Sequence, residues 1–322
     1  MFTSKEQIEA SLRAARVSAA RAAALAARAK PCVRLEAIVL AEDETIPLGA
    51  TRIGGRPDLP AGTAWPVRPP YPDAADRIAE TRATLENIRA TNEAALARNS
   101  PYAWSSDKVE AQARYLLDAI APVAEARPLT FVAQLDLAGI QTVQPLDPDI
   151  PVAGRLVFFY DVEQQPEGVN PEDSAGWVVL HDTADASTLS RIVPPSDAVS
   201  SFRPLRGHGR AAVSPVPEEE AFPSDRSDPD RASLVEWYSD RYDALLGRID
   251  WRAHQAGGHP DQIQLGPQPG RKAEDWILLM QIDSDHRSGM TWGDSGMLYV
   301  WIRREDLQAR RFDRARVILQ SL

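Results

Sequence analysis

Residues 276–302 read WILLMQIDSDHRSGMTWGDSGMLYVWI, and this stretch decides the fold. Its first five residues form a near-continuous apolar run, which predicts a strand buried on both faces. The Asp and Ser side chains that follow end this run, because they compete for backbone hydrogen bonds. Residues 293–296 (GDSG) predict a tight turn, and residues 297–302 are rich in the β-branched and aromatic side chains of a second strand.

Three sequence blocks occur twice, in the same order. GGRPDLPAGTAWP, LTFVAQLDL and GRLVFFYD begin at residues 54, 129 and 154, and HQAGGHP, LLMQIDSD and WGDSGMLYVWI begin at residues 254, 278 and 292. Each block alone is ordinary turn or strand chemistry, but the shared order indicates an internal duplication. Two copies are too few for a solenoid, so we predict a pair of pseudo-symmetric halves.

Together these blocks resemble the YwqG family, also called the DUF1963 domain. The resemblance covers residues 53–65, 129–161 and 254–313. It implies a bacterial protein of unknown biochemical function, and members of the family are often suggested to be immunity proteins of toxin systems. The family joins its WP element to the AQ strand by a short linker, whereas here residues 67–127 intervene and are predicted to be an insertion.

The predicted fold class is α+β and internally duplicated, with mostly antiparallel sheets in two related halves, an N-terminal helix and a helical-hairpin insertion. The N-terminal segment, residues 1–31, is expected to form one helix from Thr3 to Lys30, with a capping box between Thr3 and Glu6. The rest is predicted to be one domain, residues 32–322. Its parts are a first copy over 33–180, a linker over 194–230 and a second copy over 232–322.

Two parts of this domain carry distinctive patterns. The insertion, residues 67–127, is predicted to be two antiparallel helices, with Tyr102 and Trp104 at the tip. Exposed, these aromatic side chains would form a contact surface; buried, they would pack the tip.

The linker holds seven prolines between residues 194 and 229, which predicts a long surface loop. A further helix is expected over 232–249, with Leu234, Trp237, Tyr238, Tyr242 and Leu245 on its apolar stripe.

The composition narrows the classes of function. The 322 residues carry a net charge of −10, which disfavours nucleic-acid binding because phosphates need a basic surface. The same charge suits a basic protein partner. A single cysteine is typical of a reducing cytosol, and no apolar run has the length of a membrane span or a signal peptide. We predict a cytoplasmic protein with no nucleic-acid or membrane partner, and the oligomeric state stays open.

Acidic side chains gather in the second copy. Asp283, Asp285 and Asp294 lie within twelve positions, on loops that flank the two predicted strands. Hard cations take six to eight oxygen ligands, often from closely spaced Asp side chains, so a divalent metal site is one hypothesis. The alternatives are acid/base catalysis and plain turn capping. No cofactor other than such a divalent cation is predicted.

A pseudo-twofold protein would bind a ligand in the groove between its halves. His254, His259, Gln281 and Trp292 are the candidates to line that groove, and His259 is expected to be exposed in its Gly-Gly turn. The sequence lacks a G-x-S-x-G elbow and a zinc-binding spacing, so it assigns no catalytic residue and favours a protein that is not an enzyme.

Two functional hypotheses remain. The first is a protein-interaction module, in particular an immunity-type inhibitor that binds a toxin. The alternative is a divalent-metal-dependent hydrolase or a small-ligand-binding protein that uses Asp283, Asp285 and Asp294.

Overall fold

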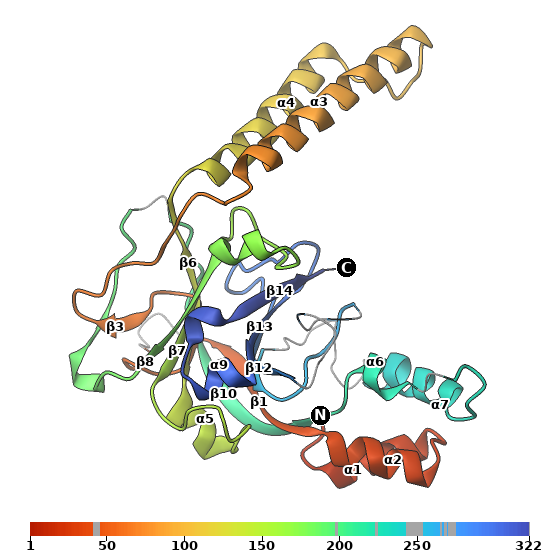
Figure 1. Ribbon diagram of the computed structural model, residues 1–322, viewed down its shortest axis with the longest axis vertical. Coiled ribbons are helices and arrows are strands. Elements are labelled where there is room, and N and C mark those ends of the chain that lie inside the picture. Colours follow the sequence, from red (N-terminus) through yellow and green to blue (C-terminus); the bar gives the residue numbers. More distant parts are fainter. Residues whose placement is uncertain are drawn as a thin grey trace.

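A ten-stranded antiparallel sheet dominates the computed structural model, which describes residues 1–40, 46–196, 199–222, 225–242, 254–264, 266, 269 and 275–321. Helices and the sheet together give the predicted α+β class (Figure 1). In spatial order the strands are β14 (Arg316–Gln320), β13 (Met297–Arg303), β12 (Trp276–Asp283), β11 (Gln255–Gly257), β1 (Lys30–Val39), β10 (Leu205–Ser214), β2 (Arg52–Ile53), β6 (Thr130–Asp136), β7 (Arg155–Tyr160) and β8 (Trp177–Asp182).

The two strands predicted from residues 276–302 are β12 and β13, and they pair antiparallel. Both are buried on their two faces, because one set of side chains faces the main core and the other set forms a second cluster with Ile318 of β14. A near-continuous apolar sequence is what such double burial requires. The predicted tight turn before β13 has positive φ angles at Gly293 and Ser295.

Both ends of the sheet contribute to one main hydrophobic core. Side chains of β6, β7 and β8 lie in the same cluster as side chains of β12, β13 and β14. Trp177 of β8 donates its indole N–H to the carbonyl of Ala315, just before β14, at 2.9 Å. The sheet therefore curves until its two edges approach each other, and the two halves share a core.

The two halves have the same pairing geometry. β2 lies beside β6 with Arg52 opposite Gln134, and β11 lies beside β12 with Gln255 opposite Gln281. The β6–β7 ladder is irregular between Phe131 and Ala133, and the β12–β13 ladder is irregular at the equivalent place, between Leu278 and Met280. These matches favour the internal duplication, which stays a prediction about the origin of the sequence.

The predicted linker is wrong over its middle part. Residues 205–214 are not a surface loop but β10, which lies at the centre of the sheet and pairs with the whole length of β1. In the sheet β10 lies between β1 and β2. Gly207 and Gly209 interrupt the apolar alternation of this strand, so its sequence lacks the period-2 pattern of a half-buried strand.

The N-terminal segment is two helices instead of the single predicted one. α1 (Lys5–Ala14) begins at the N-cap Ser4 rather than at Thr3, and α2 (Ala19–Arg28) follows a break at which Arg16 has a φ of 69°. Asp230 holds this break, because its carboxylate accepts hydrogen bonds from the backbone N–H of Ser18 at 2.7 Å and from its hydroxyl at 2.5 Å. β1 then begins at Lys30 and passes through Pro31.

Short elements complete the described chain. α6 (Glu218–Ala221) and α7 (Arg231–Glu236) pack on the N-terminal helices. α7 continues as a π-helical turn (Trp237–Tyr242). Leu245, which was predicted for the apolar stripe of this helix, lies outside the described residues. The remaining elements are β3 (Asp58–Pro60), β4 (Val67–Arg68), β5 (Arg127–Pro128), α5 (Leu137–Val143), β9 (Leu189–Arg191), α9 (Arg304–Gln308) and short 3-10 turns.

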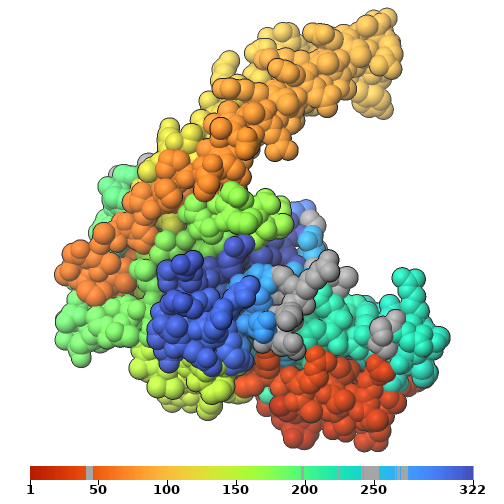
Figure 2. Space-filling model, in the orientation of Figure 1, coloured from red at the N-terminus to blue at the C-terminus, as the bar shows by residue number. Residues whose placement is uncertain are grey.

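The insertion forms the predicted helical hairpin, which extends away from the body of the protein (Figures 1 and 2). Its helices are α3 (Ala74–Ala97) and α4 (Ser106–Ile120). The facing side chains recur at alternating spacings of three and four residues, which is the repeat of a coiled-coil seam. This seam consists of Ile78, Thr81, Leu85, Ile88, Asn92 and Ala95 on α3, and Val109, Ala113, Leu116 and Ile120 on α4.

Candidate functional site

The structure brings together two of the residues predicted for separate roles, His254 and Asp285. Both side chains are fully buried, and His254 Nε2 lies 3.5 Å from Asp285 Oδ2. His254 Nδ1 accepts a hydrogen bond from the backbone N–H of Asp283 at 3.1 Å, so the ring proton belongs on Nε2. Arg287 completes the cluster and donates to both carboxylate oxygens of Asp285, at 2.9 and 2.6 Å.

This cluster holds a turn together. Burial by itself would raise the pKa of Asp285, but the interactions with His254 and Arg287 outweigh it and hold the pKa well below its usual value. The Asp285 backbone pairs with Met290 across the same turn. Asp285 is thus an ionised carboxylate whose oxygens are already engaged by protein groups.

The predicted metal ligands are spread over different environments. Asp285 is buried, Asp283 is half-buried at the end of β12, and Asp294 is exposed in the turn before β13. Over the ranges of chain that the structure describes, no three or more His, Cys, Asp or Glu side chains are grouped so that they could hold a metal ion. The positive group beside Asp285 among the described residues is the guanidinium of Arg287.

A second buried network contains the predicted groove residue Gln281. Gln281 Oε1 accepts from the backbone N–H of Asp261 at 3.0 Å, and its Nε2 donates to the Asp261 carboxylate at 2.7 Å. Arg34 donates to both oxygens of this carboxylate, and the Tyr242 hydroxyl donates to Oδ1 at 2.7 Å. Burial alone would raise the pKa of Asp261. The opposite effect of the Arg34 guanidinium is larger, so the pKa lies below its usual value and both side chains are charged inside the protein.

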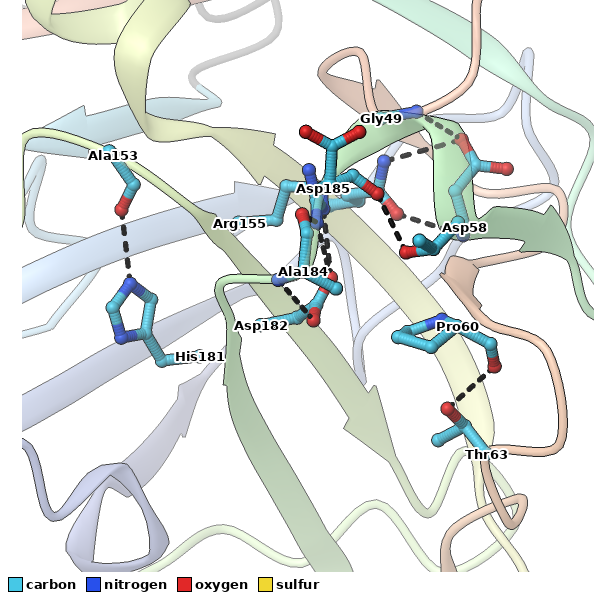
Figure 3. Close-up of polar contacts among 12 residues, drawn as sticks. Gly49, Asp58, Pro60, Thr63, Ala153, Arg155, His181, Asp182, Ala184 and Asp185 are labelled. Carbon is cyan, nitrogen blue, oxygen red and sulfur yellow. Dashed lines mark hydrogen bonds and ion pairs between the residues drawn. The ribbon is translucent and has the colours of Figure 1, made fainter.

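The first half holds the equivalent network, which the sequence analysis missed. Gln134 Oε1 accepts from the backbone N–H of Asp58 at 2.9 Å. The Asp58 carboxylate accepts from the Gly49 N–H at 3.0 Å (Figure 3). It also accepts from Arg191 Nε at 3.0 Å and forms a 3.1 Å ion pair with Arg52. The available signal was a Gly-Gly-x-Pro-Asp block and a glutamine at the end of an apolar strand, both of which occur twice.

The His181–Asp182 pair at the end of β8 does not form a catalytic dyad. Figure 3 shows the two side chains engaged with different partners. His181 Nε2 lies 3.1 Å from the carbonyl of Ala153, and the Asp182 carboxylate accepts from Arg155 Nε at 3.0 Å and from its Nη2 at 2.5 Å. Both residues therefore stabilise the edge of the sheet.

The other two groove candidates lie in the protein interior. The expectation that His259 is exposed is wrong: only 7% of it is exposed, its backbone N–H donates to the Ser214 hydroxyl, and its Nε2 lies 3.1 Å from the carbonyl of Arg28. Trp292 is fully buried, with edge-to-face contacts to Tyr160 and Phe202. All four groove candidates are thus buried.

The burial of His259 predicts a pH dependence of stability. Burial, with a smaller contribution from Lys30, lowers the pKa of His259 from 6.5 to about 3. At pH values between these two pKa values, His259 binds a proton in the unfolded chain but not in the folded protein. This group's contribution to stability is therefore fully present above the unfolded pKa and is lost as the pH falls, by up to about 1.4 kcal/mol per pH unit.

Urea unfolding at neutral pH and at about pH 4.5 measures this contribution. The His259→Gln variant is expected to lose less stability between the two conditions than the unaltered protein. His208→Gln is the matched control, because His208 is exposed on β10. Equal losses in the unaltered protein and the His259→Gln variant would contradict the prediction.

The hairpin offers the most prominent exposed surface. Near its tip Tyr102 is 86% exposed and Leu96 is 52% exposed, and Tyr115 on α4 is 67% exposed. Trp104 instead packs at the tip, where its backbone bonds both ends of the Asn92 amide at 2.6 and 3.1 Å. At the tip Tyr102 is therefore exposed, whereas Trp104 is packed.

These features define a class of protein: an α+β sheet protein with buried Asp–Gln–Arg networks and a projecting coiled-coil hairpin. A family model described as a domain of unknown function, DUF1963, matches residues 51–321, and the chain belongs to this family. No protein of curated function matches the sequence significantly. Among the helices of the described residues, none combines the length and the apolar character needed to cross a membrane.

Proposed function

We propose that this chain is a YwqG-like bacterial protein of the cytoplasm that works as a protein-interaction module, with the α3–α4 hairpin as its contact element. The observation that carries the proposal is the projection of the hairpin from the body (Figure 2). A projecting helical pair leaves most of its surface open to solvent, and at this hairpin large apolar side chains are part of that surface.

The exposed side chains are of the kind that anchor protein interfaces. Tyrosine is enriched among the residues that contribute most to binding, because it buries a large area at a low entropic cost. Tyr102 and Tyr115 present such area on a rigid support, since Asn92 fixes the tip and Lys108 lies 4.3 Å above the Trp104 ring. A partner would therefore meet a preformed surface.

The partner that fits is a separate protein with a basic surface. The chain carries a net charge of −10, and opposite charges on two partners speed association and favour the correct pairing. A toxin inhibited by an immunity-type protein is the specific form of this proposal, which rests on the family resemblance. A cytoplasmic location agrees with Cys32, which is a free and fully buried thiol.

Titration calorimetry with the purified product of the neighbouring gene tests this function. We expect the Tyr102→Ser/Tyr115→Ser variant to bind about tenfold more weakly or worse, because the variant loses two aromatic anchors. The control is Val152→Ser/Val169→Ser, which removes two apolar side chains that are each 71% exposed and lie outside the hairpin. The control variant is expected to bind as the unaltered protein does.

Two results would count against the proposal. One is equal binding by the tyrosine variant and the control variant, which would exclude the hairpin as the contact element. The other is self-association through the hairpin, measured by light scattering on a size-exclusion column and abolished by the tyrosine substitutions. That result would mean that the exposed surface is occupied by a second copy of this chain.

A further inference from the structure

The two equivalent Asp–Gln networks differ in charge. In the second half one guanidinium, Arg34, neutralises one carboxylate, Asp261, and the two side chains are only 3% and 2% exposed. In the first half two guanidiniums, Arg52 and Arg191, share the single carboxylate of Asp58. Among the described residues, the second network therefore pairs one arginine with one carboxylate, whereas the first places two arginines on one carboxylate.

The network of Asp58 opens into a pocket. The pocket has a volume of about 410 Å³, and Arg52 and Arg191 lie in its wall together with a third arginine, Arg56. The Arg191 side chain is 32% exposed and Arg56 is exposed, so both are accessible to solvent. Among the described residues that line the pocket, the charged side chains are all arginines.

The burial of the Arg52 guanidinium is only partly compensated by its described contacts. The Arg52 side chain is 1% exposed, Nη1 donates to the carbonyl of Arg56, and Nη2 forms the ion pair with Asp58. Within the described part of the chain, Nε has no hydrogen-bond partner. Burial, opposed by Asp58 and reinforced by Arg191, lowers the pKa of Arg52 to about 10. An anion in the pocket would offset the repulsion between these guanidiniums.

We propose that the pocket lined by Arg52, Arg56 and Arg191 binds a small organic anion. A carboxylate or phosphate group of the ligand would lie against the arginines, whose planar forks match the geometry of both groups. The rest of the ligand would pack against Phe202, Ile46 and Pro204, which form the apolar part of the wall. A mostly apolar pocket with a few convergent polar groups is typical of small-molecule sites.

The backbone beside the pocket has a constrained conformation. Gly55 at its wall has a φ of +79°, and a Cβ there would come within 2.8 Å of Pro204. The chain therefore turns sharply between Arg52 and Arg56, and the Nη1 bond of Arg52 to the Arg56 carbonyl fixes that turn. The Arg52 guanidinium is thus held in place before any ligand arrives, which lowers the entropic cost of binding.

Calorimetric titration with phenyl phosphate and with benzoate tests the proposal, and phenol serves as the uncharged probe. We expect both anions to bind, and phenol to bind at least tenfold more weakly, since it lacks the charge. Arg56→Gln is expected to weaken binding of the anions about tenfold, because an arginine–anion contact is charge-assisted. The control is Arg82→Gln, which removes an equal charge from an exposed position on α3 and is expected to leave binding unchanged.

The outcomes are distinguishable. Tighter binding of phenyl phosphate identifies a phosphorylated ligand, and tighter binding of benzoate identifies a carboxylate; either supports the site. Absence of saturation with both anions at millimolar concentration would overturn the proposal. So would anion binding that Arg56→Gln leaves unchanged, because Arg56 is exposed and its loss should not affect folding. None of these measurements depends on a protein partner of the hairpin.

Discussion

Replacement of Asp261 by leucine is expected to lower the free energy of unfolding by about 3–5 kcal/mol, because it leaves the buried Arg34 guanidinium without its counter-charge. Arg34 is 3% exposed and cannot reach water without a rearrangement of β1. The substitution also removes the acceptor of the Tyr242 hydroxyl and of the Gln281 amide. Urea unfolding followed by circular dichroism measures the loss.

A double variant separates the charge from the rest of the network. Arg34→Met/Asp261→Leu removes both charges, and an apolar pair of similar volume is often close to neutral in cost. We therefore expect the double variant to be more stable than Asp261→Leu alone, although it contains one substitution more. If the two substitutions simply add, the ion pair is not what couples β1 to the Pro260–Asp261 segment.

The second large effect is expected at Gly168. Its φ is +78°, and a Cβ at this position would lie 1.7 Å from the carbonyl oxygen of Val317. This approach joins the loop after β7 to β14, together with a hydrogen bond from the backbone N–H of Leu319 to the carbonyl of Glu167 at 3.0 Å. Gly168→Ala is expected to cost at least about 3 kcal/mol, since the backbone of β14 or of the loop must move.

Gly62→Ala is the matched control for this prediction. Gly62 has a similar φ of +85°, but nothing lies within 4 Å of the Cβ that alanine would add. Gly62→Ala should lower the free energy of unfolding only by the cost of holding alanine in the left-handed conformation, about 1–2 kcal/mol. The difference in unfolding free energy between the two variants measures the close approach. Equal losses would show that the loop does not press against β14.

The sequence predicted the elements that carry their own pattern. β12 and β13 followed from apolar runs, and the hairpin followed from helical periodicity. β10 was missed, because its place in the sheet depends on pairing with β1 and not on its own glycine-containing sequence. The break between α1 and α2 was missed for a similar reason: Asp230, which caps Ser18, lies 212 residues away in the chain.

In the candidate sites, too, the sequence showed local clusters but not the contacts between distant residues. Asp285 was singled out as a member of a local acidic cluster, but its carboxylate lies beside His254, which comes from another strand end, and forms an ion pair with Arg287. Asp58 and Gln134 lie 76 residues apart, and neither looked unusual beside its neighbours in the sequence. Their role appears only when both halves of the fold are compared. Among the described residues, the Asp261 network then contains one arginine, and the Asp58 network contains two.

The order of strands at the centre of the sheet has a consequence for how the chain acquires its structure. β1 lies between β10 and β11, so both of its neighbours are translated more than half a chain later. Contacts of such long sequence separation slow folding, because the entropy of loop closure is lost before the contacts form. During synthesis β1 emerges first and waits with both edges unpaired, and unpaired edges favour aggregation. The nascent chain is therefore expected to depend on chaperones until residues 205–214 have left the ribosome.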